Sequence, residues 1–123
     1  MHVVLSIGSN ISETKVVNAI EWLKCQMAEI QVSSIYETKA VKCGCRNYNN
    51  AVVSGIIDMD VDSFNGLLKE YEIASGRSEA ARLIGDVPID IDIVVSNGVV
   101  MRPWDYRQNF FRIGASELAC TPV

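Results

Sequence analysis

Residues 87–95 read Val-Pro-Ile-Asp-Ile-Asp-Ile-Val-Val and combine an isoleucine-rich strand pattern with two aspartates. Because side chains alternate between the faces of a strand, the pattern predicts isoleucines on one face and Asp90 and Asp92 on the other, with Cα atoms roughly 6.6 Å apart. Neighbouring carboxylates repel unless a cation lies between them, and aspartate is depleted in strands. The stretch therefore predicts either a site for a hard cation such as Mg²⁺ or an edge strand with a solvated outer face.

The length and composition indicate one compact domain over residues 1–123. Of these residues, 49% are hydrophobic, which is enough for a single core. The sequence contains no apolar run of membrane-spanning length and no signal-type N-terminal segment, so we expect a cytoplasmic protein without a membrane partner. The net charge of -4 and the pI near 4.9 argue against a nucleic-acid-binding protein with a broad basic face.

The cysteines allow a distant alternative function. The four cysteines are Cys25, Cys43, Cys45 and Cys120, and the only histidine is His2. A structural zinc site would need a second close pair or a histidine partner beside Cys43 and Cys45. We therefore expect reduced thiols, and a thiol-based metal carrier is the minor alternative.

Hydrophobic periodicity along the chain predicts alternating strands and helices. The expected strands cover residues 2–7, 32–36, 48–57 and 87–95. The expected helices begin at the N-caps Ser12 and Asp62 and carry two apolar stripes, Val16, Ile20, Leu23, Met27 and Ile30 in the first and Phe64, Leu67, Leu68, Tyr71 and Ala74 in the second. Gly76 suits the C-terminal turn of the second helix, and Asn97-Gly98 predicts a type I′ hairpin after the last strand.

This order predicts an α+β fold, a ferredoxin-like sandwich (βαββαβ plus a C-terminal hairpin) with helices on one face of an antiparallel sheet. The other face is then available for a ligand. If Ala51 and Val53 point toward the helices, Tyr48 and Asn50 share a face with the aspartates. The Tyr-Asn pair is then either solvated or suited to a flat heteroaromatic ligand. We expect residues 77–86 to form an irregular connection, and the segment after the hairpin to be irregular with a short helix near residues 115–119.

Five motifs in this order resemble the 6-hydroxymethyl-7,8-dihydropterin pyrophosphokinase family of folate biosynthesis. They are Gly8-Ser9-Asn10, Ser33-Ser34-Ile35-Tyr36-Glu37-Thr38, Tyr48-Asn49-Asn50-Ala51-Val52, Glu72 with Gly76-Arg77, and Ile89-Asp90-Ile91-Asp92-Ile93. The resemblance extends from about residue 3 to Glu117-Leu118. It implies a diphosphokinase that transfers a pyrophosphoryl group from ATP to the hydroxymethyl oxygen of a reduced pterin and releases AMP.

The resemblance also implies roles for individual residues. Asp90 and Asp92 match paired aspartates that hold two Mg²⁺ ions against the ATP phosphates, which agrees with the charge argument above. Arg77 and Arg82 are candidate phosphate contacts and count with the aspartates as catalytic residues. Glu72 and Arg77 match positions beside the nucleotide. The implied pterin contacts are Asn10, Thr38, Lys39, Val41, Tyr48, Asn50 and Phe110.

The chain departs from the family where cationic side chains are expected. Two arginine positions before the aspartate strand fall on Glu79 and Val87. The family's Pro-His pair reads Pro103-Trp104, and a further arginine position aligns with Gln108. Nearby arginines that could replace the missing charges are Arg102, Arg107 and Arg112. Since one preorganised donor contributes roughly 10²–10³ in rate, losing several predicts a weakened relative that binds pterin or nucleotide without efficient turnover, the alternative to an active enzyme.

Overall fold

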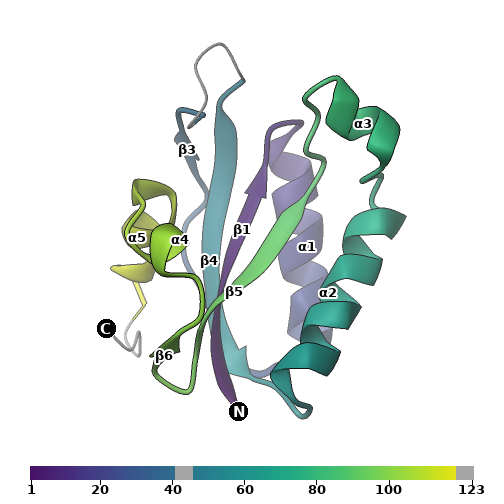
Figure 1. Cartoon of the computed structure of the whole chain (residues 1–123). Coiled ribbons are helices and arrows are strands. Elements are labelled where there is room, and N and C mark those ends of the chain that lie inside the picture. Colours follow the sequence, from purple (N-terminus) through teal and green to yellow (C-terminus); the bar gives the residue numbers. More distant parts are fainter. Residues whose placement is uncertain (41–45, 119–123) are drawn as a thin grey trace.

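Figure 1 shows the computed structural model of the chain, an antiparallel sheet with helices packed against it. The structure describes residues 1–40 and 46–118. The strands are β1 (His2–Ser9), β2 (Ala28–Val32), β3 (Tyr36–Thr38), β4 (Tyr48–Ile56), β5 (Asp90–Ser96) and β6 (Val99–Val100). The helices are α1 (Glu13–Gln26), α2 (Val61–Ala74), α3 (Glu79–Leu83), α4 (Pro103–Tyr106) and α5 (Asn109–Ala115). The strands lie in the order β2-β4-β1-β5-β6, with β3 also paired to β4, which confirms the α+β ferredoxin-like fold.

The main core lies between the sheet and the helices α1 and α2. It contains alternate residues of the central strands and the inner faces of both helices, among them Val3, Leu5, Ile7, Ile89, Ile91, Val16, Leu23, Phe64 and Leu68. Both predicted apolar stripes contribute to it, except that Ile30 belongs to β2 and Ala74 is exposed. Alternation along β1 leaves Ser6 and Gly8 on the opposite face, where the pocket described below lies.

The predicted strand over residues 32–36 was wrong, because the chain breaks there into β2 and β3. Ser33 lies at the break, where its hydroxyl accepts a hydrogen bond from the Val52 amide at 2.8 Å. The amide and hydroxyl of Ser34 both donate to the Glu117 carboxylate at 2.8 Å. At this point the Ser33 hydroxyl and the Glu117 carboxylate accept hydrogen bonds from backbone amides in place of backbone carbonyls. Short hydroxyl side chains can compete with the sheet in this way, and the strand is interrupted.

The helix ends agree with the sequence at Ser12, whose hydroxyl accepts from the Lys15 amide as an N-cap. The prediction for α2 was wrong by two residues, because Asp60 accepts from the Ser63 amide at 2.7 Å. That hydrogen bond holds the pKa of Asp60 below its usual range. Asp62 instead lies in the first turn, where a negative charge also suits the helix dipole. The hairpin prediction is confirmed, since Asn97 and Gly98 both have positive φ angles, 47° and 79°.

The connection predicted as irregular contains the short helix α3, capped by the Ser78 hydroxyl. The segment after the hairpin forms α4 and α5 instead of a helix near residues 115–119. In addition to the helices on the first face, α5 packs over part of the second face against Val4, Val52 and Val94. Gly114 permits this approach, since a Cβ there would lie 2.6 Å from Val52 Cγ2. None of the helices in the described part of the chain is long and apolar enough to cross a membrane.

Candidate functional site

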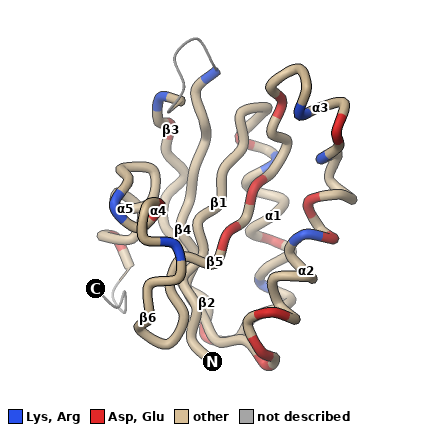
Figure 2. The backbone as a smooth tube through the Cα atoms, in the orientation of Figure 1, with Lys and Arg blue, Asp and Glu red and all other residues tan. Residues whose placement is uncertain are grey.

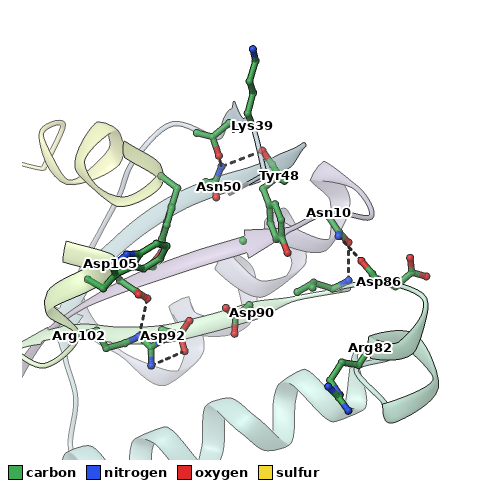
Figure 3. Close-up of a pocket in the computed structure, with 18 residues that line it drawn as sticks. Asn10, Lys39, Tyr48, Asn50, Arg82, Asp86, Asp90, Asp92, Arg102 and Asp105 are labelled. Atoms are coloured by element: carbon green, nitrogen blue, oxygen red, sulfur yellow. Dashed lines mark hydrogen bonds and ion pairs between the residues drawn. The ribbon is translucent and has the colours of Figure 1, made fainter. Parts of the chain in front are cut away.

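A pocket of about 520 Å³ lies on the sheet face opposite α1 and α2 (Figure 3). Its lining includes residues of α3, α4 and α5, whose arrangement in the fold is shown in Figure 1. Predicted site residues that line it are Asn10, Thr38, Lys39, Tyr48, Asn50, Arg82, Asp90, Asp92 and Phe110. Arg102, one of the predicted replacements for the missing charges, also lines the pocket, together with residues without a predicted role, namely Ser6, Gly8, Ala40, Gly85, Asp86, Val87, Trp104 and Asp105. The predicted contact Val41 lies outside the described residues. The structure thus brings together residues that lie up to 104 positions apart in sequence.

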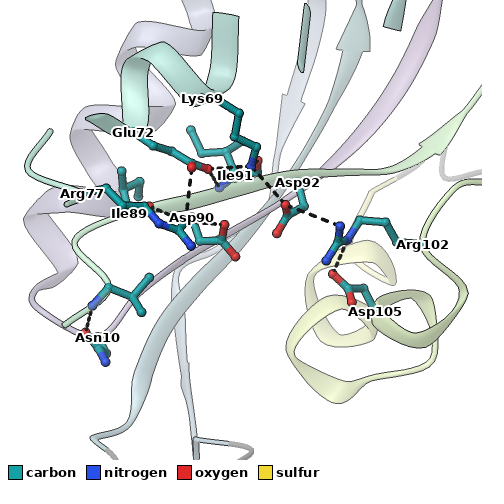
Figure 4. Close-up of polar contacts among 11 residues, drawn as sticks. Asn10, Lys69, Glu72, Arg77, Ile89, Asp90, Ile91, Asp92, Arg102 and Asp105 are labelled. Atoms are coloured by element: carbon teal, nitrogen blue, oxygen red, sulfur yellow. Dashed lines mark hydrogen bonds and ion pairs between the residues drawn. The ribbon is translucent and has the colours of Figure 1, made fainter. Parts of the chain in front are cut away.

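Asp90 and Asp92 lie side by side on β5 and face cations from three directions (Figure 4). Arg77 donates to Asp90 Oδ1 at 2.8 Å, and Lys69 Nζ lies 3.3 Å from Asp92 Oδ1. Arg102 Nη1 lies 3.9 Å from the same Asp92 oxygen. The Asp92 side chain is 14% exposed and that of Asp90 is 37% exposed. We call these two residues the acid pair.

The acid pair shares its negative charge unequally. Burial raises the pKa of Asp92, and the neighbouring Asp90 raises it further, to about 7. Burial also acts to raise the pKa of Asp90, but hydrogen bonds with Asp92 and Arg77 outweigh it and hold that pKa below its usual range. Near neutral pH the two carboxyl groups therefore carry a total charge between −1 and −2, as expected for close carboxylates.

The acid pair suits a cation that arrives with a phosphorylated ligand. Its donors are carboxylate oxygens, which hard divalent cations prefer. Among residues 1–40 and 46–118, no group of three or more His, Cys, Asp or Glu side chains is arranged to hold a metal ion. Mg²⁺ is commonly held by one or two carboxylates together with waters and substrate phosphates. The residues present therefore fit Mg²⁺ bound jointly with a polyphosphate.

Glu72 and Arg77 do not line the pocket and instead support the acid pair from the α2 side. Glu72 is 3% exposed, and its carboxylate accepts from the Ile91 amide at 2.8 Å, from Lys69 Nζ at 3.0 Å and from Arg77 Nη1 at 3.2 Å. The same two cations bind the acid pair, so Glu72 fixes their positions (Figure 4). Lys69 was not among the residues predicted from the sequence, although its spacing of three residues from Glu72 on a helix indicated this ion pair.

The other end of the pocket is aromatic. Tyr48 projects from β4 on the same side of the sheet as the acid pair (Figure 3). Phe110 lines the pocket from α5, and its ring centroid lies 6.0 Å from that of Trp104. The Asn50 amide nitrogen donates to Thr38 Oγ1 at 2.8 Å and to the Tyr48 carbonyl at 3.1 Å. These bonds hold the Asn50 side chain in one orientation. The arrangement suits a flat ring with polar edges.

Asn10 holds the loop that enters β5. Its Nδ2 donates to the Gly85 carbonyl at 2.8 Å, and its Oδ1 accepts from the Val87 amide at 2.7 Å. Both ends of the Asn10 amide are therefore used to position this loop. Arg82, in the adjacent α3, pairs with Glu79 of the same helix at 2.7 Å, and its side chain is 72% exposed. Arg82 lines the rim of the pocket in this conformation without an ion pair to Asp90 or Asp92 within the described residues.

The model of the 7,8-dihydro-6-hydroxymethylpterin-pyrophosphokinase (HPPK) family matches residues 4–119, nearly the whole chain. A search of curated proteins finds no match. The matched segment contains every described residue that lines the pocket, from Ser6 to Phe110. The chain belongs to the 7,8-dihydro-6-hydroxymethylpterin-pyrophosphokinase family.

Proposed function

We propose that the protein is a cytoplasmic, Mg²⁺-dependent transferase that moves a pyrophosphoryl group from ATP to 6-hydroxymethyl-7,8-dihydropterin. One observation carries this proposal: a single pocket joins an aromatic, polar-edged end to a pair of acidic side chains. The aromatic end suits a pterin ring, and the acid pair suits a metal-bound polyphosphate. Membership of the family supports the same assignment.

In the proposed reaction, the pterin hydroxymethyl oxygen forms a bond to the β-phosphorus of ATP. The bond between that phosphorus and the oxygen bridging to the α-phosphorus breaks, its electrons leave with AMP, and the hydroxyl proton passes to solvent. Tyr48 and Phe110 would hold the pterin ring by stacking, and Asn50 would bind its polar edge. Asp90 and Asp92 would hold two Mg²⁺ ions, which when bound neutralise and orient the triphosphate. Positioning of the two substrates then supplies much of the rate.

The direct test is to incubate the pure protein with Mg²⁺, ATP and the reduced pterin alcohol and to measure AMP and pterin diphosphate. We expect the two products in equal amounts. AMP without pterin diphosphate would indicate hydrolysis, and absence of both would contradict the proposed activity. Omission of Mg²⁺ is expected to abolish product formation, because the acid pair would otherwise repel the triphosphate.

A second candidate is a relative that binds pterin or nucleotide without efficient turnover. The exposed position of Arg82 and its pairing with Glu79 favour it, since no ion pair joins this arginine to the acid pair in the described residues. Tight pterin binding without AMP release would support this candidate. The thiol-based carrier stays a distant prediction, because Cys43 and Cys45 lie outside the described residues and Cys25 is a free, exposed thiol.

Replacing Tyr48 by alanine is expected to weaken pterin binding about tenfold, because stacking on an aromatic side chain contributes about 1–3 kcal/mol per base in comparable sites. Nucleotide affinity should change less than about twofold, since the acid pair is untouched. Calorimetric titration with each ligand separately measures both effects. Tyr48→Phe retains the ring and serves as the matched control, with near-normal pterin affinity. Equal losses for both ligands would place the pterin elsewhere.

The raised pKa of Asp92 predicts that this carboxyl group titrates near neutral pH in the metal-free protein. Below about pH 7 it holds a proton that Mg²⁺ must displace, so metal binding weakens as the pH falls and releases a proton there. Carbon-13 NMR of the aspartate carboxyl groups measures the midpoint directly. We expect one midpoint near 7 that moves to lower pH when Mg²⁺ is added. Midpoints below about 5 for all aspartates would contradict the prediction.

A further inference from the structure

The pocket contains three cationic side chains with different surroundings. Lys39 and Arg82 are exposed at the rim, and Arg82 pairs with Glu79 of its own helix. Arg102 and Arg82 lie on opposite sides of the acid pair (Figure 3). The Nη1 atom of Arg102 lies 3.9 Å from Asp92 Oδ1. Figure 2 shows the basic positions of the described residues dispersed over separate elements. Arg102 is the lining cation for which the described structure shows an ion pair with Asp92.

Arg102 is held in place from both ends. Its guanidinium Nε lies 2.8 Å from Oδ2 of Asp105, a residue only 8% exposed. Its backbone carbonyl accepts from the Tyr106 amide at 2.9 Å, and the preceding Met101 amide donates to the Val94 carbonyl of β5 at 2.7 Å. An arginine fixed through Nε keeps its two terminal nitrogens for another partner, in a fork that matches phosphate oxygens.

The other two arginines of this region point elsewhere. Arg107 borders a second hollow with Gln108 and Asn109, which shares Thr38, Lys39 and Phe110 with the pocket but does not include the acid pair. Arg112 lies over the Tyr106 ring at 5.5 Å and donates to the Tyr106 carbonyl at 3.2 Å. Of the three arginines that the sequence offered as replacements, the structure therefore brings only Arg102 into the pocket beside the acid pair.

We propose that Arg102 binds the polyphosphate of the nucleotide at the Asp92 end of the pocket, and that Asp105 is its positioning residue. This inference rests on the proposed function. The 3.9 Å separation from Asp92 is longer than a hydrogen bond, so a phosphate oxygen can replace that contact without breaking a close pair. The contact with Asp105 at 2.8 Å stays in place. Arg102 thereby supplies a positive charge to the pocket, whereas the family's two arginine positions before β5 are occupied here by Glu79 and Val87.

The test measures binding separately from turnover. Affinities for Mg²⁺ with a non-hydrolysable ATP analogue and for the pterin alone are determined by calorimetry for Arg102→Ala, Arg102→Lys and Asp105→Asn. We expect Arg102→Ala to weaken analogue binding about 10- to 100-fold, the range for loss of a charge-assisted contact, with unchanged pterin affinity. Arg102→Lys should restore part of the loss. Asp105→Asn should weaken analogue binding by an intermediate factor, because the guanidinium is no longer held.

Arg112→Ala is the matched control, since it removes one arginine of the same segment without touching the pocket. If Arg102→Ala and Arg112→Ala bind the analogue equally well, the inference is overturned. A uniform loss of pterin and analogue affinity in Arg102→Ala would show a structural effect and would also overturn it. A selective loss of analogue affinity supports the inference even if the wild-type protein forms no AMP, a result that would contradict the proposed function alone.

Discussion

Replacing Asp92 by asparagine is expected to lower the rate of pyrophosphoryl transfer by about 10³-fold, which corresponds to about 4 kcal/mol of transition-state stabilisation. The amide keeps the shape of the side chain but removes the charge that would hold a cation against the triphosphate. The acid pair is the only pair of carboxylates on β5, and Asp92 is its more buried member. Steady-state kinetics with both substrates saturating measure the loss.

The same variant should bind the pterin normally, because it leaves the proposed pterin contacts Tyr48, Asn50 and Phe110 unchanged. It should also fold at least as stably as the wild type, since the repulsion from Asp90 is removed. Asp58→Asn is the matched control, an exposed aspartate outside the pocket whose loss should leave the rate unchanged. A turnover within about tenfold of wild type in Asp92→Asn would exclude Asp92 as a metal ligand essential to the reaction.

Much of the fold could be predicted because its signals are local. Alternation in residues 87–95 predicted the strand that carries the acid pair, and Asn97-Gly98 predicted the hairpin after it. Helical spacing located the inner faces of α1 and α2. Since alternate residues share a face, the placement of Tyr48 and Asn50 on the side of Asp90 also followed from the sequence.

The misses concern interactions between distant segments. The break at Ser33 depends on its pairing with Val52, and the packing of α5 depends on the contact of Gly114 with the same residue. Periodicity within one segment cannot reveal either contact. The same holds for Arg102, which precedes α4 and contacts both Asp105, three residues later, and Asp92 of β5. Nine of the residues named by the resemblance line one pocket, while only the structure distinguished Arg102 from Arg107 and Arg112.

Replacing Glu72 by alanine is expected to destabilise the protein by about 2–4 kcal/mol. The change leaves the buried Ile91 amide without its acceptor and removes a shared partner of Lys69 and Arg77. Since both cations are about 40% exposed, water recovers part of their loss, and the buried amide carries most of the expected effect. Urea unfolding measures the change in the free energy of unfolding, with one value of the denaturant slope m fitted to wild type and variants.

The chain supplies a closely matched control in the exposed pair Glu21 and Lys24 on α1, which has the same spacing along a helix as Lys69 and Glu72. Glu21 is 64% exposed, so Glu21→Ala should cost less than about 0.5 kcal/mol. Glu72→Gln keeps an acceptor for the Ile91 amide but loses the charge, and an intermediate cost of about 1–2 kcal/mol is expected. Equal costs for Glu72→Ala and Glu21→Ala would mean that Glu72 does not anchor α2 to β5. In that case the positions of Arg77 and Lys69 beside the acid pair would need another explanation.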